Sequence, residues 1–185
     1  SRFSVITYDQ SNKYKDYADA KTQDVSIEGF AEDAVSFLTT IGKNEVILCC
    51  HSTGCGIGLT LAARFPALIK GLVLINPWLW PDEYLIAVQN MRMKMAELLD
   101  PVNYSKFNSS LLFPPFYRRK YHTEFEKLAK DAPLNPHNPV EIKGRLNAII
   151  NYDARPITHK IQCPTLILSA HDDQLMPRWF SEDLA

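Results

Sequence analysis

The sequence has 185 residues, of which 46% are hydrophobic, and its formal net charge is −1. A chain of this length and composition can bury one sizeable core, which excludes a disordered chain and favours a globular domain. Charges of both signs are spread along it, so no surface for nucleic acid or an anionic membrane is indicated. A small-molecule substrate is the expected partner.

No apolar run reaches the roughly 18 residues that a membrane-spanning helix needs, and the first residues lack the order of a secretory signal. We therefore expect a soluble, cytoplasmic protein. The cysteines show no Cys-x-x-Cys spacing, so neither a zinc site nor a disulfide framework is predicted, and no metal or other cofactor is indicated. Buried free thiols are expected at the four positions, which are Cys49, Cys50, Cys55 and Cys163.

The predicted elements begin with an aromatic and β-branched run at residues 3–8, which is typical of a buried strand, and a polar loop follows it. Apolar residues then recur every three or four positions between Ser26, a plausible N-cap, and Gly42, a plausible stop. This pattern predicts an amphipathic helix. A strand at residues 46–50, a further helix and a strand at residues 71–75 come next. Alternating strands and helices predict a parallel sheet with right-handed crossovers.

Residues 77–158 break this alternation, because they hold most of the prolines and no further β pattern. A helical insertion is predicted there. Its helical patterns cover residues 82–99, 123–132 and 139–150. A strand pattern returns at residues 164–170, and a helix begins after it. The sequence thus predicts an α/β core at residues 1–76, a helical insertion at residues 77–158 and a closing core segment at residues 159–185.

The stretch VILCCHSTGCGIG, residues 46–58, leads from a strand into a glycine-rich turn. Phosphate binding is not supported, because Leu59 occupies the last glycine position of the dinucleotide fingerprint and no Gly-Lys-Ser/Thr follows. A nucleophile elbow, Gly-x-Ser-x-Gly, is matched by Ser52 and Gly54, with Cys50 in place of the first glycine. The alternative is that the Ser52 hydroxyl only caps the next helix.

Two further residues extend the nucleophile hypothesis. The amide of Thr53 at the start of the helix is a candidate oxyanion donor, because helix N-termini favour negative charge. A second landmark, LILSAHDDQLMP, takes a strand into two aspartates, where the acid of a Ser-Asp-His triad is expected. Asp173 is the candidate and Asp172 is its neighbouring alternative. Either carboxylate could instead belong to an exposed turn or a helix cap.

The general base is not identified among the five histidines. His51 and His171 lie on the same tight turns as the candidate nucleophile and acid, where they cannot easily bridge them. The other three fall in the insertion or at its edge and are expected to be solvated or packed in a core. They are His122, His137 and His159.

In these residues the chain resembles the α/β-hydrolase superfamily, and the likeness extends over essentially its whole length. It is carried by FSVITYDQ, by IEGFAEDAVSFLTTIG and by the elbow region that ends in LVLINPW. The resemblance implies an α/β-hydrolase fold, a mostly parallel sheet flanked by helices with an inserted helical cap. It also implies Ser52 as the nucleophile, Thr53 as the oxyanion residue and Asp173 as the acid.

More narrowly, NPWLW, LLFPP and GRLNAIINYD resemble aminoacrylate hydrolases and enol-lactonases. This likeness implies a small carboxylate-bearing substrate, for which an arginine could be the charge partner. The candidates are Arg118, Arg119, Arg145 and Arg155. The loop after Asp9 lacks the Arg-Gly-x-Gly pattern that is common in the relatives.

Family members carry strands and a second oxyanion donor before the equivalent of Ser1, and a triad histidine after the equivalent of Ala185. We therefore expect an internal fragment of a serine hydrolase that is nearly inactive by itself. The expected substrate is a small ester, amide, lactone or enamine-type molecule. The alternatives are a complete protein that lacks catalytic parts, a non-catalytic domain that binds a small ligand or partner, and a cofactor-free haloperoxidase or perhydrolase.

Overall fold

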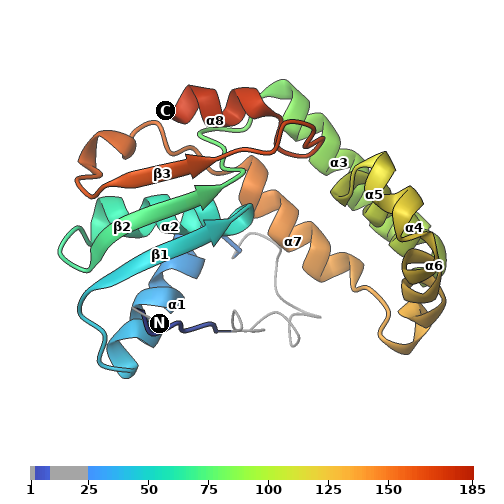
Figure 1. Cartoon of the computed structure of the whole chain (residues 1–185), viewed down its shortest axis with the longest axis horizontal. Helices are drawn as coiled ribbons and strands as arrows, with labels where there is room; N and C mark the ends of the chain where they lie inside the picture. Colours follow the sequence, from blue (N-terminus) through green and yellow to red (C-terminus); the bar gives the residue numbers. More distant parts are fainter. Residues whose placement is uncertain (1–2, 9–24) are drawn as a thin grey trace.

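A computed structural model describes residues 3–8 and 25–185 of the chain. A parallel sheet with the strand order β1-β2-β3 lies on the left of the view in Figure 1. The strands are β1 (Val46–His51), β2 (Ile69–Ile75) and β3 (Thr165–Leu168). The apolar runs that predicted them are short and bounded by turn residues, and these three predictions are confirmed.

Two helices lie behind this sheet, with α2 (Thr53–Arg64) directly on it and α1 (Ile27–Thr40) against α2 (Figure 1). The Ser26 hydroxyl accepts a hydrogen bond from the Gly29 amide at 3.1 Å, which confirms Ser26 as the N-cap of α1. Phe30, Ala34 and Leu38 share the buried face of α1, as their spacing predicts. Burying a side chain such as Phe30 contributes about 2 kcal/mol, so this stripe holds α1 in place.

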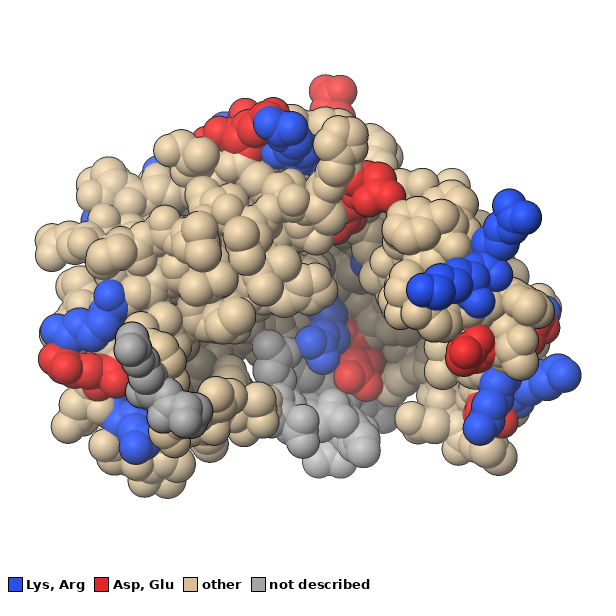
Figure 2. Space-filling view, viewed as in Figure 1, with Lys and Arg blue, Asp and Glu red and all other residues tan. Residues whose placement is uncertain are grey.

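The opposite face of the sheet is apolar and open. Alternate residues point to it, and the register sets Cys49 of β1 beside Val73 of β2 and Leu166 of β3. Ile47 is 57% exposed and Leu166 is 53% exposed. Figure 2 views the molecule from this side and shows a broad area over the strands with few charged side chains. Parallel sheets are normally covered on both faces. In the described part of this chain, one face of the sheet is instead exposed and apolar.

The strand predicted at residues 3–8 is wrong. These residues lie outside the sheet, and Phe3 is 68% exposed and Val5 is 84% exposed. The Tyr8 ring instead stacks on Phe37 of α1, with 4.8 Å between the ring centroids. An apolar run becomes a strand only where a neighbouring strand supplies a hydrogen-bonded ladder, which composition does not reveal. The polar loop predicted after it lies at residues 9–24, outside the described residues.

Between β2 and β3 the chain is helical. The helices are α3 (Glu83–Leu98), α4 (Pro101–Leu112), α5 (Pro115–Lys120), α6 (His122–Asp131) and α7 (Pro139–Ile150), with a 3-10 turn η2 (Ala132–Leu134). They form an arm beside the sheet, in which α3 packs along α7 and α4 along α6 (Figure 1). The helical patterns of α3, α6 and α7 were predicted, and these predictions are confirmed. Among the described residues, no helix is both long and apolar enough to cross a membrane.

The chain returns from this arm to the sheet through Tyr152, which is almost fully buried. Its hydroxyl donates to the Gly56 carbonyl at 3.0 Å and lies 2.9 Å from the Thr60 hydroxyl. Its ring meets Trp78 edge to face, with 5.7 Å between centroids. Tyr152 therefore fixes the end of the arm to α2. The 3-10 turn η3 (Thr158–Lys160) then leads to β3.

A second set of contacts ties the start of α3 to the segment after β3. The Asp82 carboxylate caps α3 by accepting from the Leu85 amide at 2.7 Å, and it also accepts from the Trp179 indole at 3.1 Å. Tyr84 donates its hydroxyl to the Gln174 carbonyl at 2.6 Å, and its ring packs edge to face on Trp179. Trp179 belongs to the last helix, α8 (Arg178–Leu184). Both ends of the helical arm are thus fastened to the sheet layer.

Candidate active site

Ser52 is the single residue between the end of β1 and the start of α2. Its backbone has φ 50° and ψ −122°, and its side chain makes no capping hydrogen bond to α2. The interpretation of Ser52 as a helix cap is therefore wrong, because a capping serine adopts extended φ/ψ and accepts from an amide of the first turn. Positive φ at a residue with a Cβ is strained, and such strain is kept at functional turns between strand and helix.

Cys50 occupies the position where a nucleophile elbow usually has its first glycine. Its thiol fits because Gly58, one turn into α2, has no side chain: a Cβ built on Gly58 would lie 2.6 Å from the Cys50 sulfur. The matching glycine of the motif, Gly54, is less crowded, since a Cβ there would meet the Cys50 Cβ at 3.9 Å. The closest approach in this region is therefore between Cys50 of the strand and Gly58 of the helix, and not at Gly54 beside the serine.

This contact predicts a strong coupling between the two positions. Gly58→Ala is expected to lower the free energy of unfolding by about 1–3 kcal/mol, because overpacking at Cys50 outweighs the better helix propensity of alanine. In a Cys50→Gly background the same change should be neutral or stabilising. Urea unfolding of the four variants measures the coupling. Additive effects would show that the Cys50 sulfur rotates away freely.

Cys50 and Cys55 are buried free thiols, as predicted, whereas Cys49 is exposed on the open face of the sheet. Burial is the main cause that raises the pKa of Cys50 and of Cys55 to about 12. The Cys55 thiol donates to the Ile75 carbonyl at 3.3 Å. Both groups stay protonated near neutral pH, so neither is a nucleophile that competes with Ser52.

Asp173 lies in the loop after β3 and accepts three hydrogen bonds. Its Oδ1 accepts from the amides of Leu175 at 2.8 Å and Met176 at 2.9 Å. Its Oδ2 accepts from the side-chain amide of Asn76 at 2.6 Å. The neighbouring Asp172 is exposed. Of the two aspartates in the landmark, the structure therefore holds Asp173 in a fixed orientation.

The ends of the three strands bring these residues to one edge of the sheet. The Ser52 amide donates to the Ile75 carbonyl at 3.0 Å, which joins the serine turn to the end of β2. The next residue, Asn76, donates its backbone amide to the Leu168 carbonyl of β3 at 2.8 Å and its side chain to Asp173. In a parallel sheet, all the carboxyl ends meet at this edge, where ligands bind.

Asn76 was not predicted as a site residue from the sequence. One signal was available. Asparagine tolerates the left-handed backbone region, and an asparagine placed directly after a strand and before a proline marks a turn.

Thr53 is the first residue of α2, which has twelve residues. The amide of a first helical residue has no partner within its helix, and the positive end of the helix dipole lies there. The amide of Cys55, two residues further along, donates to the Ser52 carbonyl at 2.7 Å. Thr53 directly follows Ser52 at the N-terminus of α2, so its amide stays the candidate oxyanion donor.

All five histidines lie within the described ranges, and none of them hydrogen-bonds there to Ser52 or Asp173. His51 ends β1 and His171 lies in the aspartate loop, and both are exposed. His137 lies in the helical arm, where a ring nitrogen is 2.9 Å from the Ala96 carbonyl and the ring stacks on Tyr104. The described residues therefore place the candidate nucleophile and the candidate acid at one edge of the sheet, and no described histidine is hydrogen-bonded to either of them.

The candidate arginines are spread over the molecule. Arg155 is paired with Asp153 at 2.7 Å and lies over the Trp80 ring. Arg118 lies over a ring of α6, and Arg145 faces Phe30 of α1. None of these contacts links an arginine to the serine turn, so the identity of a substrate-binding arginine stays a prediction.

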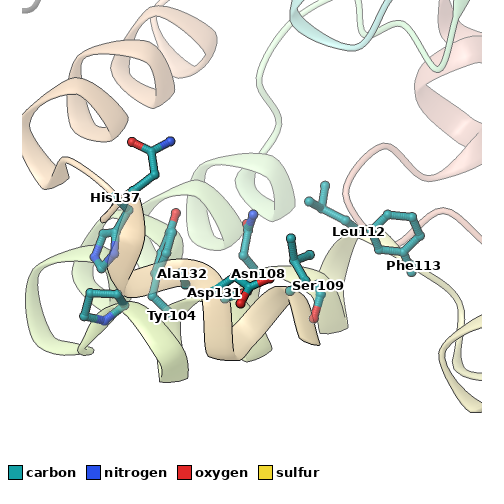
Figure 3. A pocket seen from close by; sticks show the side chains of 12 residues that line it. Tyr104, Asn108, Ser109, Leu112, Phe113, Asp131, Ala132 and His137 are labelled. Atoms are coloured by element: carbon teal, nitrogen blue, oxygen red, sulfur yellow. The ribbon is translucent and has the colours of Figure 1, made fainter. Parts of the chain in front are cut away.

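A pocket of about 360 Å³ opens in the helical arm, away from this edge (Figure 3). Residues of α4, of α6 and of the turn that follows α6 line it, and Ser52, Asn76 and Asp173 do not. Tyr104 and His137 stand on one wall with Asp131 and Asn108 nearby (Figure 3). In the described part of the chain, no three His, Cys, Asp or Glu side chains come close enough to form a metal site.

A parallel sheet flanked by helices, with a strained serine between strand and helix and an aspartate after a later strand, is the architecture of an α/β-hydrolase. Residues 19–185 match the model of the family described as serine aminopeptidase, S33, and the chain belongs to this family. The prediction of an α/β-hydrolase fold is confirmed.

The curated relatives include proteins named as carbamate hydrolases. The RutD protein of Stutzerimonas stutzeri (strain A1501) is 29% identical over 99% of this chain, and the chain spans 69% of that protein. RutD of Azorhizobium caulinodans is 26% identical over the whole chain, with 69% of its own length spanned.

Solved structures show the same fold at lower sequence identity. The α/β-hydrolase MGS-M2 from a Medee basin deep-sea metagenome library has a TM-score of 0.79 at 21% identity over 89% of this chain. The enol-lactonase of Burkholderia xenovorans LB400 has a TM-score of 0.74 at 21% identity over 86% of this chain. The chain spans 62% of the first structure and 60% of the second.

Proposed function

We propose that the chain forms the nucleophile-and-acid part of a serine hydrolase. The observation that carries this proposal is the backbone of Ser52, which is held at φ 50° between a strand and a helix without any capping hydrogen bond. A strained serine whose side chain makes no capping hydrogen bond is kept because its Oγ must project from the turn. Membership of a hydrolase family supports the same role.

In the proposed reaction the Ser52 Oγ attacks a carbonyl carbon of the substrate. Its proton passes to a base, and the carbonyl electron pair moves onto the oxygen, which the Thr53 amide stabilises. Collapse of this tetrahedral intermediate expels the leaving group with the proton from the base and leaves an acyl-serine. Water, deprotonated by the same base, then attacks the acyl-serine and restores the hydroxyl.

Asp173 orients the base and stabilises its cationic form. No described histidine is hydrogen-bonded to Ser52 or Asp173, so the base that we propose is a histidine other than the five of this sequence. The helical arm from α3 to α7 covers the substrate as a cap. A second oxyanion donor is also needed from outside the described residues.

The substrate we propose is a small ester, amide, lactone, carbamate or enamine-type molecule. Support for this class comes from the names of the relatives, which include carbamate hydrolases and an enol-lactonase. Each of these substrates offers one electrophilic carbonyl or its equivalent to a serine nucleophile. No cofactor is needed for such chemistry.

The test is covalent labelling with a fluorophosphonate, applied to the complete gene product that contains these residues. Wild type should be labelled, and Ser52→Ala should not. Ser36→Ala, a change at an exposed serine of α1, is the matched control and should be labelled like wild type. Equal labelling of Ser52→Ala would overturn the proposal and leave a non-catalytic binding domain as the better explanation. The isolated 185-residue polypeptide is expected to react at least about a thousandfold more slowly.

A further inference from the structure

Asn76 and Ser52 are the two non-glycine residues with positive φ in the described part of the chain. Asn76 has φ 51° and follows β2 directly, beside the serine turn that follows β1. Positive φ costs free energy at a residue with a Cβ, although asparagine bears it better than most. The two strained residues thus end adjacent strands at the same edge of the sheet.

The Asn76 side chain is fully used at this edge. Its amide nitrogen donates to Asp173 Oδ2 at 2.6 Å, and its oxygen accepts from the Ala170 amide at 2.8 Å. Its backbone amide donates to the Leu168 carbonyl at 2.8 Å, and the residue is only 8% exposed. Three hydrogen bonds therefore lock Asn76 to the strand and loop that carry the aspartate.

The aspartate is consequently held from both sides. The amides of Leu175 and Met176 fix one carboxylate oxygen, and Asn76 fixes the other. An acid that orients a base must present its remaining lone pairs in one direction, because a misplacement of about 1 Å can cost about a hundredfold in rate. A neutral amide supplies this constraint without a charge that would compete with the base for the carboxylate.

We propose that Asn76 is a positioning residue that sets the orientation of the Asp173 carboxylate for catalysis. The inference rests on the proposed function, since it gives Asp173 the role of triad acid. It goes further in assigning a role to the residue that directly follows β2, the strand between the one that leads to Ser52 and the one that leads to Asp173. The left-handed backbone of Asn76 is what turns its side chain from the end of β2 toward the loop after β3.

The test compares two variants of the complete gene product with wild type. Asn76→Gly keeps the positive φ without strain and removes the side chain. Asn76→Asp keeps the shape of the side chain but places a second carboxylate against Asp173. Asn44→Gly changes an exposed asparagine before β1, at the opposite end of the sheet, and is the matched control. The readouts are kcat and KM for an ester substrate between roughly pH 5 and 9, and the midpoint of thermal unfolding.

Asn76→Gly is expected to lower kcat about 10- to 100-fold with KM nearly unchanged, because the substrate is still bound but the base is poorly oriented. Asn76→Asp should lose activity as the pH rises. Two carboxylates in contact share a proton at low pH, when one can donate to the other as the amide did, and they repel once this proton is lost. The neighbouring side chains of His51, His171 and Asp172 are the same in every variant, so the difference from wild type isolates the new pair.

The proposal is overturned if both variants shift only the unfolding midpoint and leave kcat and its pH profile like those of wild type. If Asn76→Gly does not fold, the pH profile of Asn76→Asp decides alone. Failure of the proposed function gives a different result, because wild-type activity would then survive in Ser52→Ala. Asn44→Gly should match wild type in every readout.

Discussion

Ser52→Gly is expected to abolish turnover and to stabilise the fold in the same step. The loss of the nucleophile should lower kcat at least about a thousandfold, to the level that binding and the oxyanion site alone support. Relief of the strain at φ 50° contributes about 1–3 kcal/mol, and the greater freedom of glycine in the unfolded chain removes about 0.5–1 kcal/mol of that gain. The net expectation is a gain of about 1 kcal/mol in the free energy of unfolding.

Ser52→Ala separates the hydroxyl from the backbone. Alanine retains the Cβ and therefore the strain, so turnover should fall as far as in Ser52→Gly while stability stays within about 0.5 kcal/mol of wild type. Ester hydrolysis and urea unfolding measure the two effects.

Ser26→Ala is the matched control for a serine that does cap its helix. It should lose about 1 kcal/mol of stability and keep its turnover, because the Ser26 hydroxyl accepts from the Gly29 amide. A comparable loss of stability in Ser52→Ala would contradict the role assigned to Ser52 and restore that of a cap.

A steep loss of stability above roughly pH 9 is the second large effect that we expect. Burial raises the pKa of Tyr152, Cys50 and Cys55 to about 12 in each case, from ordinary values of 10.0 for the tyrosine and 9.0 for the thiols. Each group is neutral in its protonated form, so the folded state binds these protons more tightly than the unfolded chain does. The stability that they contribute is complete below about pH 9 and is lost as the pH rises toward about 12. The summed loss should reach several kcal/mol.

Urea unfolding in reducing buffer at stepped pH values measures this decline, and two variants assign it. Tyr152→Phe should be less stable at neutral pH by about 1–3 kcal/mol, because the Gly56 carbonyl and the Thr60 hydroxyl lose their partner. Its stability should then fall less between about pH 10 and 12 than that of wild type. Cys55→Ala should flatten the curve from about pH 9 onward.

Tyr117→Phe, at an exposed tyrosine of α5, should follow the wild-type curve throughout. Parallel curves for wild type, Tyr152→Phe and Cys55→Ala would show that these groups ionise without unfolding the chain.

The strands and the serine turn could be predicted because their signals are local. An apolar run is followed within a few residues by Ser52 and a series of glycines. This local pattern predicts both the end of β1 and the start of α2. The run at residues 3–8 carries the same composition, yet it packs on α1 through Tyr8. The composition of a segment does not show whether another strand lies beside it to form the hydrogen-bonded pair that a strand requires.

Helices α4 and α5 were not predicted, because their sequence is rich in Asn, Ser, Pro and aromatic residues without a clear period. The residues at the helix starts do indicate these two helices. Asp100 precedes Pro101 and accepts from two amides of the first turn of α4, and Pro115 likewise opens α5. A Pro at the first helical position after an Asp is a start signal that does not depend on hydrophobic spacing.

In the candidate site, too, the residues marked by a local motif could be predicted, and those that depend on contacts between distant segments could not. Ser52 and Asp173 were proposed from motifs, because each lies where a strand ends. The Asn76–Asp173 hydrogen bond joins residues 97 positions apart and depends on the register of β2 with β3, which no local pattern encodes. Cys50 departs from the motif in the sequence itself, but the dependence of its thiol on Gly58 follows only from the packing distance between strand and helix.

The hydrogen bonds from Trp179 to Asp82 and from Tyr84 to Gln174 join the first turn of α3 to the residues on both sides of the α8 start. Gln174 follows Asp173 directly. A tilt of α3 away from the sheet must therefore break both bonds or carry the aspartate loop with it. The position of α3 is in this way coupled mechanically to the loop that carries Asp173, although the two lie about 90 residues apart in the sequence.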